Sequence, residues 1–183
     1  MRRTLAMLSI FFLAAASLCG CSNPQTLPMN SITVAGLERA YHLFVPENPP
    51  EGPMALLVAF HGGGGIGETF PQQNRFEALA ESEGVVLALP QGYAFPGNEG
   101  EWQLNTTDSS RHDIEFVAAM IDEIATQHTI DPTRIYATGY SLGSMFTYEV
   151  ACQMSDRFAA IASFAGTMPI EPSACEPQRF API

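Results

Sequence analysis

The twelve residues 134–145 read RIYATGYSLGSM and decide the fold. Residues 134–138 are rich in strand-forming side chains, and the residues after Ser141 favour a helix. Between the two lies GYSLG, residues 139–143, a Gly-x-Ser-x-Gly pattern. A strand-to-helix turn of this kind is so tight that larger side chains beside it would collide with backbone, and it lifts the serine hydroxyl clear of the sheet. The stretch therefore predicts a nucleophile elbow with Ser141 as the nucleophile; the alternative is a helix N-cap serine in a glycine turn.

Strands and helices alternate along the rest of the chain. Met54–Phe60 reads MALLVAF, a continuous apolar run that is typical of a strand buried on both faces. The alternation predicts an α/β fold with a mostly parallel sheet, helices on both faces, and reactive groups at the carboxyl ends of the strands. Asp131-Pro132 predicts a turn. The other strands are expected at Ser31–Val34, Arg39–Val45, Val85–Leu89, Arg134–Thr138 and Phe158–Phe164, and helices near Pro71–Glu83, His112–His128 and Leu142–Met154.

A glycine-rich loop, HGGGG over residues 61–65, follows the strand Met54–Phe60. Glycines let backbone N–H groups turn toward a ligand, and a His-Gly-Gly-Gly run after an early strand is the usual source of an oxyanion-hole donor. We expect the N–H of Gly63 to be this donor, with Gly64 as the alternative. The N–H of Leu142, at the start of a helix, is expected to be the other donor. His61 is expected to tie the loop down, because the base of an elbow enzyme follows the nucleophile in the chain.

The composition excludes several classes of protein. The 183 residues carry 8 arginines, no lysine and 19 acidic side chains, for a net charge of −11. Nucleic acids and anionic lipid headgroups require clustered cations, which this sequence lacks. Residues 62–69, GGGGIGET, match a phosphate-binding P-loop except that Glu68 replaces the essential lysine, which argues against a nucleotide. No His-Glu-x-x-His motif or metal-spaced cluster occurs, so we expect neither a metal nor another cofactor.

Three aromatic residues and one histidine lie outside these motifs. Tyr93, Phe95 and Trp102 lie in a long segment after a strand. They either line a substrate pocket or pack in the core. His42 is expected at the surface, near an edge of the sheet. No pattern in the sequence predicts an oligomeric state.

The N-terminus predicts export. Met1-Arg2-Arg3 is a basic start, and residues 4–18 are almost wholly apolar but too short to span a bilayer, which is the layout of a secretory signal peptide. Residues 18–21, LCGC, resemble the lipobox of bacterial lipoproteins, whose signal is cut before a cysteine that receives a diacylglyceride. The resemblance implies a signal peptide over 1–20, lipidation of Cys21 and a tether over 21–30. The protein would then be periplasmic or extracellular and would contact a membrane only through this lipid anchor.

Two cysteines remain, Cys152 and Cys175. An isolated pair in an exported protein usually forms a disulfide, because export exposes thiols to oxidants. A disulfide is therefore expected here, with two buried free thiols as the alternative.

Several of these motifs together resemble a known family. They are HGGGG, the helix start Asp113-Ile114, IDPTRIYATGYSLGSM over 130–145 and DRFAAIASFAG over 156–166. Their order is similar to that of secreted polyhydroxybutyrate depolymerase-like, feruloyl and acetylxylan esterases, which are α/β-hydrolases. The resemblance implies an acyl-enzyme on Ser141 and a hydroxyalkanoate, aromatic or acetyl ester as substrate. It also supports the cysteine pairing, because in that family the cysteine after the elbow helix often pairs with one near position 175. Ser144 and His112 depart slightly from the family pattern.

The length conflicts with this resemblance. α/β-hydrolases place an acid and then a histidine after the nucleophile, and no histidine follows Ser141 in this sequence. We therefore expect residues 31–183 to be the N-terminal part of such a domain, without the strands that deliver the acid and the base. Expressed as written, the chain is expected to be inactive and poorly soluble. The alternative is a catalytically inactive lipoprotein binding module on a hydrolase scaffold.

Overall fold

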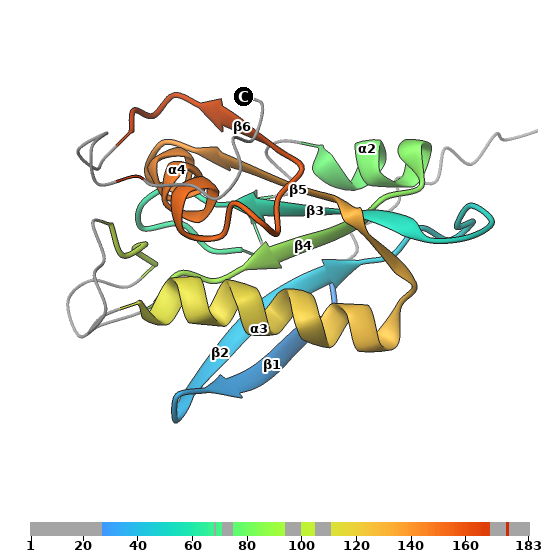
Figure 1. Cartoon of the computed structure of the whole chain (residues 1–183), viewed down its shortest axis with the longest axis horizontal. Coiled ribbons are helices and arrows are strands. Elements are labelled where there is room, and N and C mark those ends of the chain that lie inside the picture. Colours follow the sequence, from blue (N-terminus) through green and yellow to red (C-terminus); the bar gives the residue numbers. More distant parts are fainter. Residues whose placement is uncertain are drawn as a thin grey trace, which may run out of the picture.

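The computed structural model describes residues 27–67, 69–70, 75–93, 100–104, 111–168 and 175. One sheet runs through this part of the chain, and Figure 1 shows its strands with the helices around them. The strands are β1 (Met29–Val34), β2 (Leu37–Phe44), β3 (Met54–Phe60), β4 (Val86–Pro90), β5 (Ile130–Tyr140) and β6 (Ala160–Phe164), and the helices are α2 (Phe76–Glu83), α3 (His112–Gln127) and α4 (Leu142–Gln153). The predicted signal peptide, Cys21, Glu68 and Phe95 lie outside the described residues.

The sheet is mostly parallel, as the sequence predicts. Its strand order is β1-β2-β4-β3-β5-β6. The strands β4, β3, β5 and β6 pair in parallel, whereas β1 and β2 form an antiparallel hairpin that joins the sheet through an antiparallel β2–β4 pairing. This order brings the carboxyl ends of β3, β4 and β5 to one edge of the sheet.

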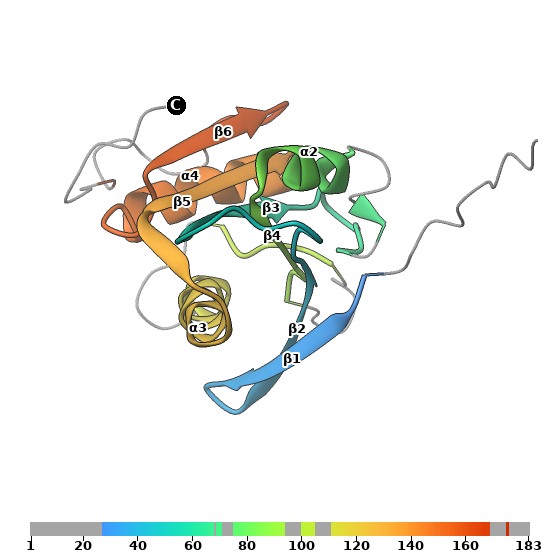
Figure 2. The same ribbon diagram turned by 90° about the vertical axis from the view of Figure 1, so that its right-hand side faces the viewer.

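Helices cover both faces of the sheet, and Figure 2 shows α3 and α4 on one side and α2 on the other. Successive side chains of β3 point to opposite faces of the sheet, so they contribute in turn to the hydrophobic core on each face. Leu56, Val58 and Phe60 belong to the larger core, with α3 and α4, while Ala59 belongs to the smaller core under α2. The apolar run Met54–Phe60 is therefore buried on both faces, which confirms its prediction as a central strand.

The predicted turn at Asp131-Pro132 is wrong as an element boundary, because both residues lie inside β5. The pairing of β5 with β3 shifts register there: Met54 lies opposite Ile130, but Leu56 lies opposite Ile135. The extra residues of β5 at this shift include Asp131, whose carboxylate accepts hydrogen bonds from the Thr133 hydroxyl and backbone N–H. These bonds lower the pKa of Asp131 to about 2. A local turn thus exists, but it is a bulge within a strand.

A disulfide joins Cys152, in the last turn of α4, to Cys175, with 5.3 Å between the Cα atoms. The predicted cysteine pairing is therefore present in the structure. None of the helices in the described ranges is long and apolar enough to cross a membrane.

Candidate active site

Ser141 lies at the junction of β5 and α4, with φ 54° and ψ −118°. A positive φ is strained for a residue with a side chain, and such strain is concentrated at functional sites. The backbone N–H of Ser141 donates a hydrogen bond of 2.9 Å to the carbonyl oxygen of Phe164, at the end of β6. The end of the neighbouring strand therefore holds the strained residue in place.

The two glycines of the elbow are required by close backbone contacts. A Cβ on Gly139 would lie 2.2 Å from the carbonyl oxygen of Gly143. A Cβ on Gly143 would lie 2.3 Å from the carbonyl oxygen of Phe60. Both distances are far shorter than any Cβ contact in a real structure, so neither position accepts a side chain unless the backbone moves. The Gly-x-Ser-x-Gly pattern therefore has the steric cause that the sequence predicts.

The glycine loop meets the elbow. A Cβ on Gly62 would lie 3.6 Å from the Cβ of Ser141, and one on Gly63 would lie 3.4 Å from Leu142 Cδ2. A Cβ on Gly64 would face open space. The glycine loop and the elbow Ser141-Leu142, which lie far apart in the sequence, are thus neighbours in the fold.

Hydrogen bonding leaves the predicted donors free. Within the loop, the N–H of Gly65 donates to the carbonyl oxygen of Gly62 at 3.0 Å. Among the described residues, nothing accepts a hydrogen bond from the N–H of Gly63, Gly64 or Leu142. For Leu142 this is expected, because the first N–H groups of a helix have no partner within it. Together with the strained serine, these N–H groups can stabilise negative charge on a bound oxygen atom.

His61 anchors the glycine loop, as the sequence predicts. The side chain is buried, its Nδ1 lies 2.7 Å from the carbonyl oxygen of Gly62, and its Nε2 accepts a hydrogen bond from the N–H of Gly92 at 3.1 Å. Because Nε2 accepts, the ring is neutral, with its proton on Nδ1. Burial lowers the pKa of His61, although its bond to Gly62 and the carboxylates of Asp113 and Glu101 oppose this shift.

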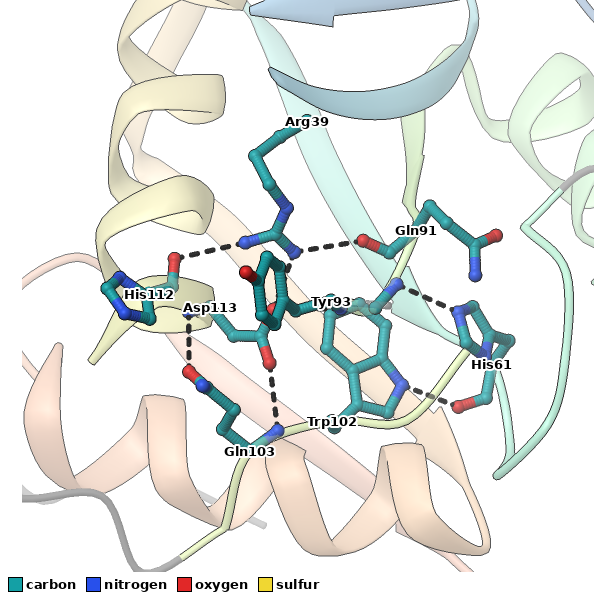
Figure 3. Close-up of polar contacts among 9 residues, drawn as sticks. Arg39, His61, Gln91, Tyr93, Trp102, Gln103, His112 and Asp113 are labelled. Carbon is teal, nitrogen blue, oxygen red and sulfur yellow. Dashed lines mark hydrogen bonds and ion pairs between the residues drawn. The ribbon is translucent and has the colours of Figure 1, made fainter. Parts of the chain in front are cut away.

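Trp102 belongs to the core rather than to a pocket wall. Its indole is buried, stacks on Phe146 with ring centroids 4.7 Å apart, and meets Phe60 edge-on at 5.2 Å. Its Nε1 donates a hydrogen bond of 2.8 Å to the carbonyl oxygen of His61 (Figure 3). Of the two interpretations of this tryptophan, core packing is therefore correct.

Gln91, the residue that follows β4, binds the glycine loop through its side chain. Its side-chain oxygen accepts from the N–H of Gly67 at 2.8 Å, and its side-chain nitrogen donates to the carbonyl oxygen of Gly65 at 3.2 Å. Its own carbonyl oxygen accepts a hydrogen bond from Arg39 (Figure 3). The sequence reasoning missed this clamp, because a glutamine after a strand gives no distinctive signal.

A buried ion pair joins Arg39 of β2 to Asp113, in the first turn of α3, with 2.5 Å between Arg39 NH2 and Asp113 Oδ1. Asp113 also accepts hydrogen bonds from the backbone N–H groups of Tyr93 and Gln103 (Figure 3). The Arg39 guanidinium lies 4.1 Å from the ring centroid of Phe116. The pair therefore ties the two segments that hold the glycine loop to the sheet and to α3.

The electrostatics of this pair are set by its burial. Burial raises the pKa of Asp113, and the Arg39 guanidinium and the N–H groups of Gln103 and Tyr93 offset part of that rise. The sequence placed Asp113 only as a favourable charge at a helix N-terminus. It gave no sign of Arg39 as the partner, because the two residues are 74 positions apart.

A small pocket of about 160 Å³ opens beside the elbow. His61 and Tyr140 belong to its wall, together with Gly62, Gly63, Gly65, Ile66, Thr69 and Phe70. In the ranges that the structure describes, no group of three or more His, Cys, Asp or Glu residues is placed to hold a metal ion.

Two other predictions concern histidine and lipidation. His42 is wrongly predicted to be a surface residue: it is buried, and its Nδ1 lies 3.1 Å from the carbonyl oxygen of Leu27. The segment before β1 covers this side of β2, which a strand pattern alone does not reveal. Cys21 and its lipidation remain predictions, because the described residues begin at Leu27.

The chain resembles known esterases in sequence. The family model described as Esterase PHB depolymerase matches residues 39–175. The protein named "Putative esterase NocK", from Nocardia uniformis subsp. tsuyamanensis, is 33% identical over 162 residues, which are 86% of this chain and 46% of that protein. The bifunctional acetylxylan esterase/xylanase XynS20E of Neocallimastix patriciarum is 32% identical over 149 residues, which are 81% of this chain and 21% of that protein. The chain thus spans less than half the length of either relative.

The chain also resembles solved structures. An acetyl xylan esterase from Aspergillus awamori superposes with a TM-score of 0.68 and 20% sequence identity, and the match covers 84% of this chain and 58% of that one. A likeness at this level of identity shows the fold alone, which is that of an α/β-hydrolase.

Proposed function

The chain belongs to the Esterase PHB depolymerase family, and from that premise we propose that it is a serine ester hydrolase acting through an acyl-enzyme on Ser141. One observation carries the proposal: a strained serine at a strand-to-helix turn lies against a glycine loop in which the N–H groups of Gly63 and Gly64 have no acceptor among the described residues. A helix N-cap serine, the other interpretation of Ser141, makes a side-chain bond to the first turn, and Ser141 makes no such bond.

In the proposed reaction, the Oγ of Ser141 attacks the carbonyl carbon of the ester and gives up its proton to a base. The tetrahedral oxygen is held by the N–H groups of Leu142 and Gly63, with Gly64 as the alternative donor. The intermediate expels the alcohol and leaves the acyl group on Ser141. A water molecule then attacks this acyl-enzyme, releases the acid and restores the serine.

The substrate is proposed to be a hydroxyalkanoate or an aromatic or acetyl ester. The family name and the acetylxylan esterase named above support this choice. The protein is proposed to be exported and anchored through lipidated Cys21. The support for export is the basic and apolar N-terminus that ends in LCGC.

A second candidate is a catalytically inactive lipoprotein binding module. The 183 residues contain no histidine after Ser141, and this candidate holds only if the rest of the coding sequence adds none. A serine without a base is a poor nucleophile at neutral pH. The coding sequence downstream of Ile183 separates the two candidates: a further strand ending in an acid, followed by a histidine, supports the enzyme, and a stop codon at that point supports the module.

The direct test is hydrolysis of p-nitrophenyl butyrate by the protein expressed from its whole coding sequence. Wild type should hydrolyse the ester, and Ser141→Ala should lose at least about 1,000-fold in kcat/KM. Ser82→Ala is the matched control, because Ser82 lies exposed on α2 and its hydroxyl bonds only to the carbonyl oxygen of Leu79. Hydrolysis that survives in Ser141→Ala would rule the proposal out.

A further inference from the structure

The carboxylate of Glu101 lies against the predicted oxyanion hole. A Cβ on Gly63 would lie 3.2 Å from Glu101 Oε1 and 3.3 Å from Oε2, and the same position lies 3.4 Å from Leu142 Cδ2. Glu101 therefore places its charge beside Gly63, one of the two residues whose N–H groups would hold the ester oxygen. Neither the motifs nor the family resemblance pointed to this residue.

The backbone on either side of Glu101 is fixed by close packing. A Cβ on Gly100 would lie 2.5 Å from the carbonyl oxygen of Gly65, and a Cβ on Gly92 would lie 2.7 Å from the carbonyl oxygen of Glu101 itself. Next in the chain, Trp102 is buried in the core and bonded to His61. Close packing thus fixes the backbone from which the Glu101 side chain extends toward the glycine loop.

The charge of Glu101 is not neutralised within the described part of the chain. The ion pairs there join Arg39 to Asp113, Arg134 to Asp131 and Arg157 to Asp122. No residue in the described ranges donates a hydrogen bond to the Glu101 carboxylate. The carboxylate also acts electrostatically on buried His61, so its field reaches the glycine loop.

We propose that Glu101 selects substrates by charge: it disfavours esters that carry a carboxylate near the scissile carbonyl and favours neutral groups or groups with a hydroxyl donor. This inference rests on the proposed ester hydrolysis at Ser141. Two like charges a few ångströms apart in a partly desolvated site repel each other strongly, whereas a hydroxyl can donate a hydrogen bond to the carboxylate. Glu101 also acts on the ester oxygen itself, but that effect is common to all substrates and cancels when two esters are compared.

The test compares two esters with four-carbon acyl groups, p-nitrophenyl butyrate and the p-nitrophenyl monoester of succinate. The measured quantity is the ratio of their kcat/KM values. In Glu101→Gln, which preserves the shape of the side chain, the preference for the neutral ester should fall on the order of tenfold. In wild type the preference should also weaken as salt is added, because salt screens the repulsion.

Glu115→Gln is the matched control, because Glu115 is an exposed acid on α3 and its loss changes the net charge by the same amount. This variant should keep the wild-type ratio. An unchanged ratio in Glu101→Gln, with hydrolysis still dependent on Ser141, would overturn the role of Glu101 and leave the proposed function standing.

Equilibrium binding distinguishes a failure of the proposed hydrolysis from a failure of the proposed role of Glu101. If wild type hydrolyses neither ester, the proposed function is wrong, and ligand-observed NMR then tests Glu101 with succinate and its uncharged analogue succinamide. Glu101→Gln should bind succinate more tightly on the order of tenfold and leave succinamide unchanged. Equal affinities for succinate in the two proteins would overturn the inference.

Discussion

The indole Nε1 of Trp102 donates a hydrogen bond to the carbonyl oxygen of His61, with 2.8 Å between the two atoms. The bond crosses 41 positions of sequence and joins the packed core to the first residue of the glycine loop. The glycine loop, which packs against the elbow at Ser141, is therefore held in place by a buried core side chain. This arrangement makes the geometry of the site depend on core packing.

Removing this hydrogen bond should cost stability. Trp102→Phe keeps an aromatic ring for Phe146 and Phe60 but leaves the buried carbonyl oxygen of His61 without its donor. The free energy of unfolding should fall by about 1–3 kcal/mol, and Trp102→Ala should cost about 3–5 kcal/mol because it also empties the core. Urea denaturation measures both values. No loss in Trp102→Phe beside a large loss in Trp102→Ala would show that packing alone matters and that the hydrogen bond does not.

The elbow should not accept a methyl group. In Gly143→Ala the new Cβ would lie 2.3 Å from a backbone oxygen of β3, so α4 must move away from the glycine loop. Unfolding should become easier by about 3 kcal/mol or more. Hydrolysis should fall about 100-fold or more, because the nucleophile and the oxyanion donors separate. Gly52→Ala is the control: its Cβ meets nothing within 4 Å, and its positive φ should cost only about 1–2 kcal/mol.

Breaking the buried ion pair Arg39–Asp113 should lower the free energy of unfolding more than breaking a more exposed ion pair does. Arg39→Met leaves the carboxylate of Asp113 buried without its cation, which should cost about 3–5 kcal/mol in unfolding free energy. Arg157→Met removes an exposed partner of Asp122 and should cost no more than about 1 kcal/mol. Denaturant titrations of the two variants give the comparison. Similar losses would mean that burial does not set the importance of the Arg39 pair.

The loss of stability in Arg39→Met should also depend on pH, because the pKa of Asp113 changes. Burial already raises the pKa of Asp113, and losing the guanidinium that opposes this rise raises it further. A group whose pKa is higher in the folded state than in the unfolded state stabilises the fold below the unfolded pKa, and that stabilisation is lost as pH rises through the folded pKa. Relative to wild type, the variant should therefore recover stability at acidic pH and lose it toward neutral pH. A constant difference between pH 4 and pH 8 would contradict this.

Acid should loosen the glycine loop through His61. Burial lowers the pKa of this histidine in the folded protein, so the unfolded state takes up its proton first as pH falls. The contribution of His61 to stability is fully present above about pH 6.5, its unfolded pKa, and decreases as pH falls toward the folded pKa. An NMR titration of the ring should give a midpoint below 6.5. A midpoint at or above 6.5 would show that the ring is not held neutral by its bonds to the loop.

The parts of the fold that sequence predicts are those with a local cause. The apolar run Met54–Phe60, the helix that begins at His112 and the elbow around Ser141 each carry their signal within a few residues, and the structure places all three as expected. The glycine loop was predicted as a local motif, and the fold supplies its position against Leu142.

The parts that sequence does not predict depend on contacts between distant segments. Arg39 meets Gln91 across 52 positions and Asp113 across 74, and no spacing rule connects them. The sequence around Trp102 fits a pocket wall and a core position equally well, and its packing against Phe60 and Phe146 decides for the core. The sequence around Glu101 gives no functional signal, because the role proposed for this residue depends on its contact with the glycine loop and not on its neighbours in the chain.

Ser141 is proposed to be the nucleophile of an ester hydrolase. Treating the protein expressed from its whole coding sequence with a fluorophosphonate probe, and mapping the modified peptide by tandem mass spectrometry, tests this most directly. We expect one adduct on Ser141 that is absent in Ser141→Ala and retained in the exposed-serine control Ser82→Ala. An adduct on a different residue, or no adduct under conditions in which the protein hydrolyses p-nitrophenyl butyrate, would contradict it.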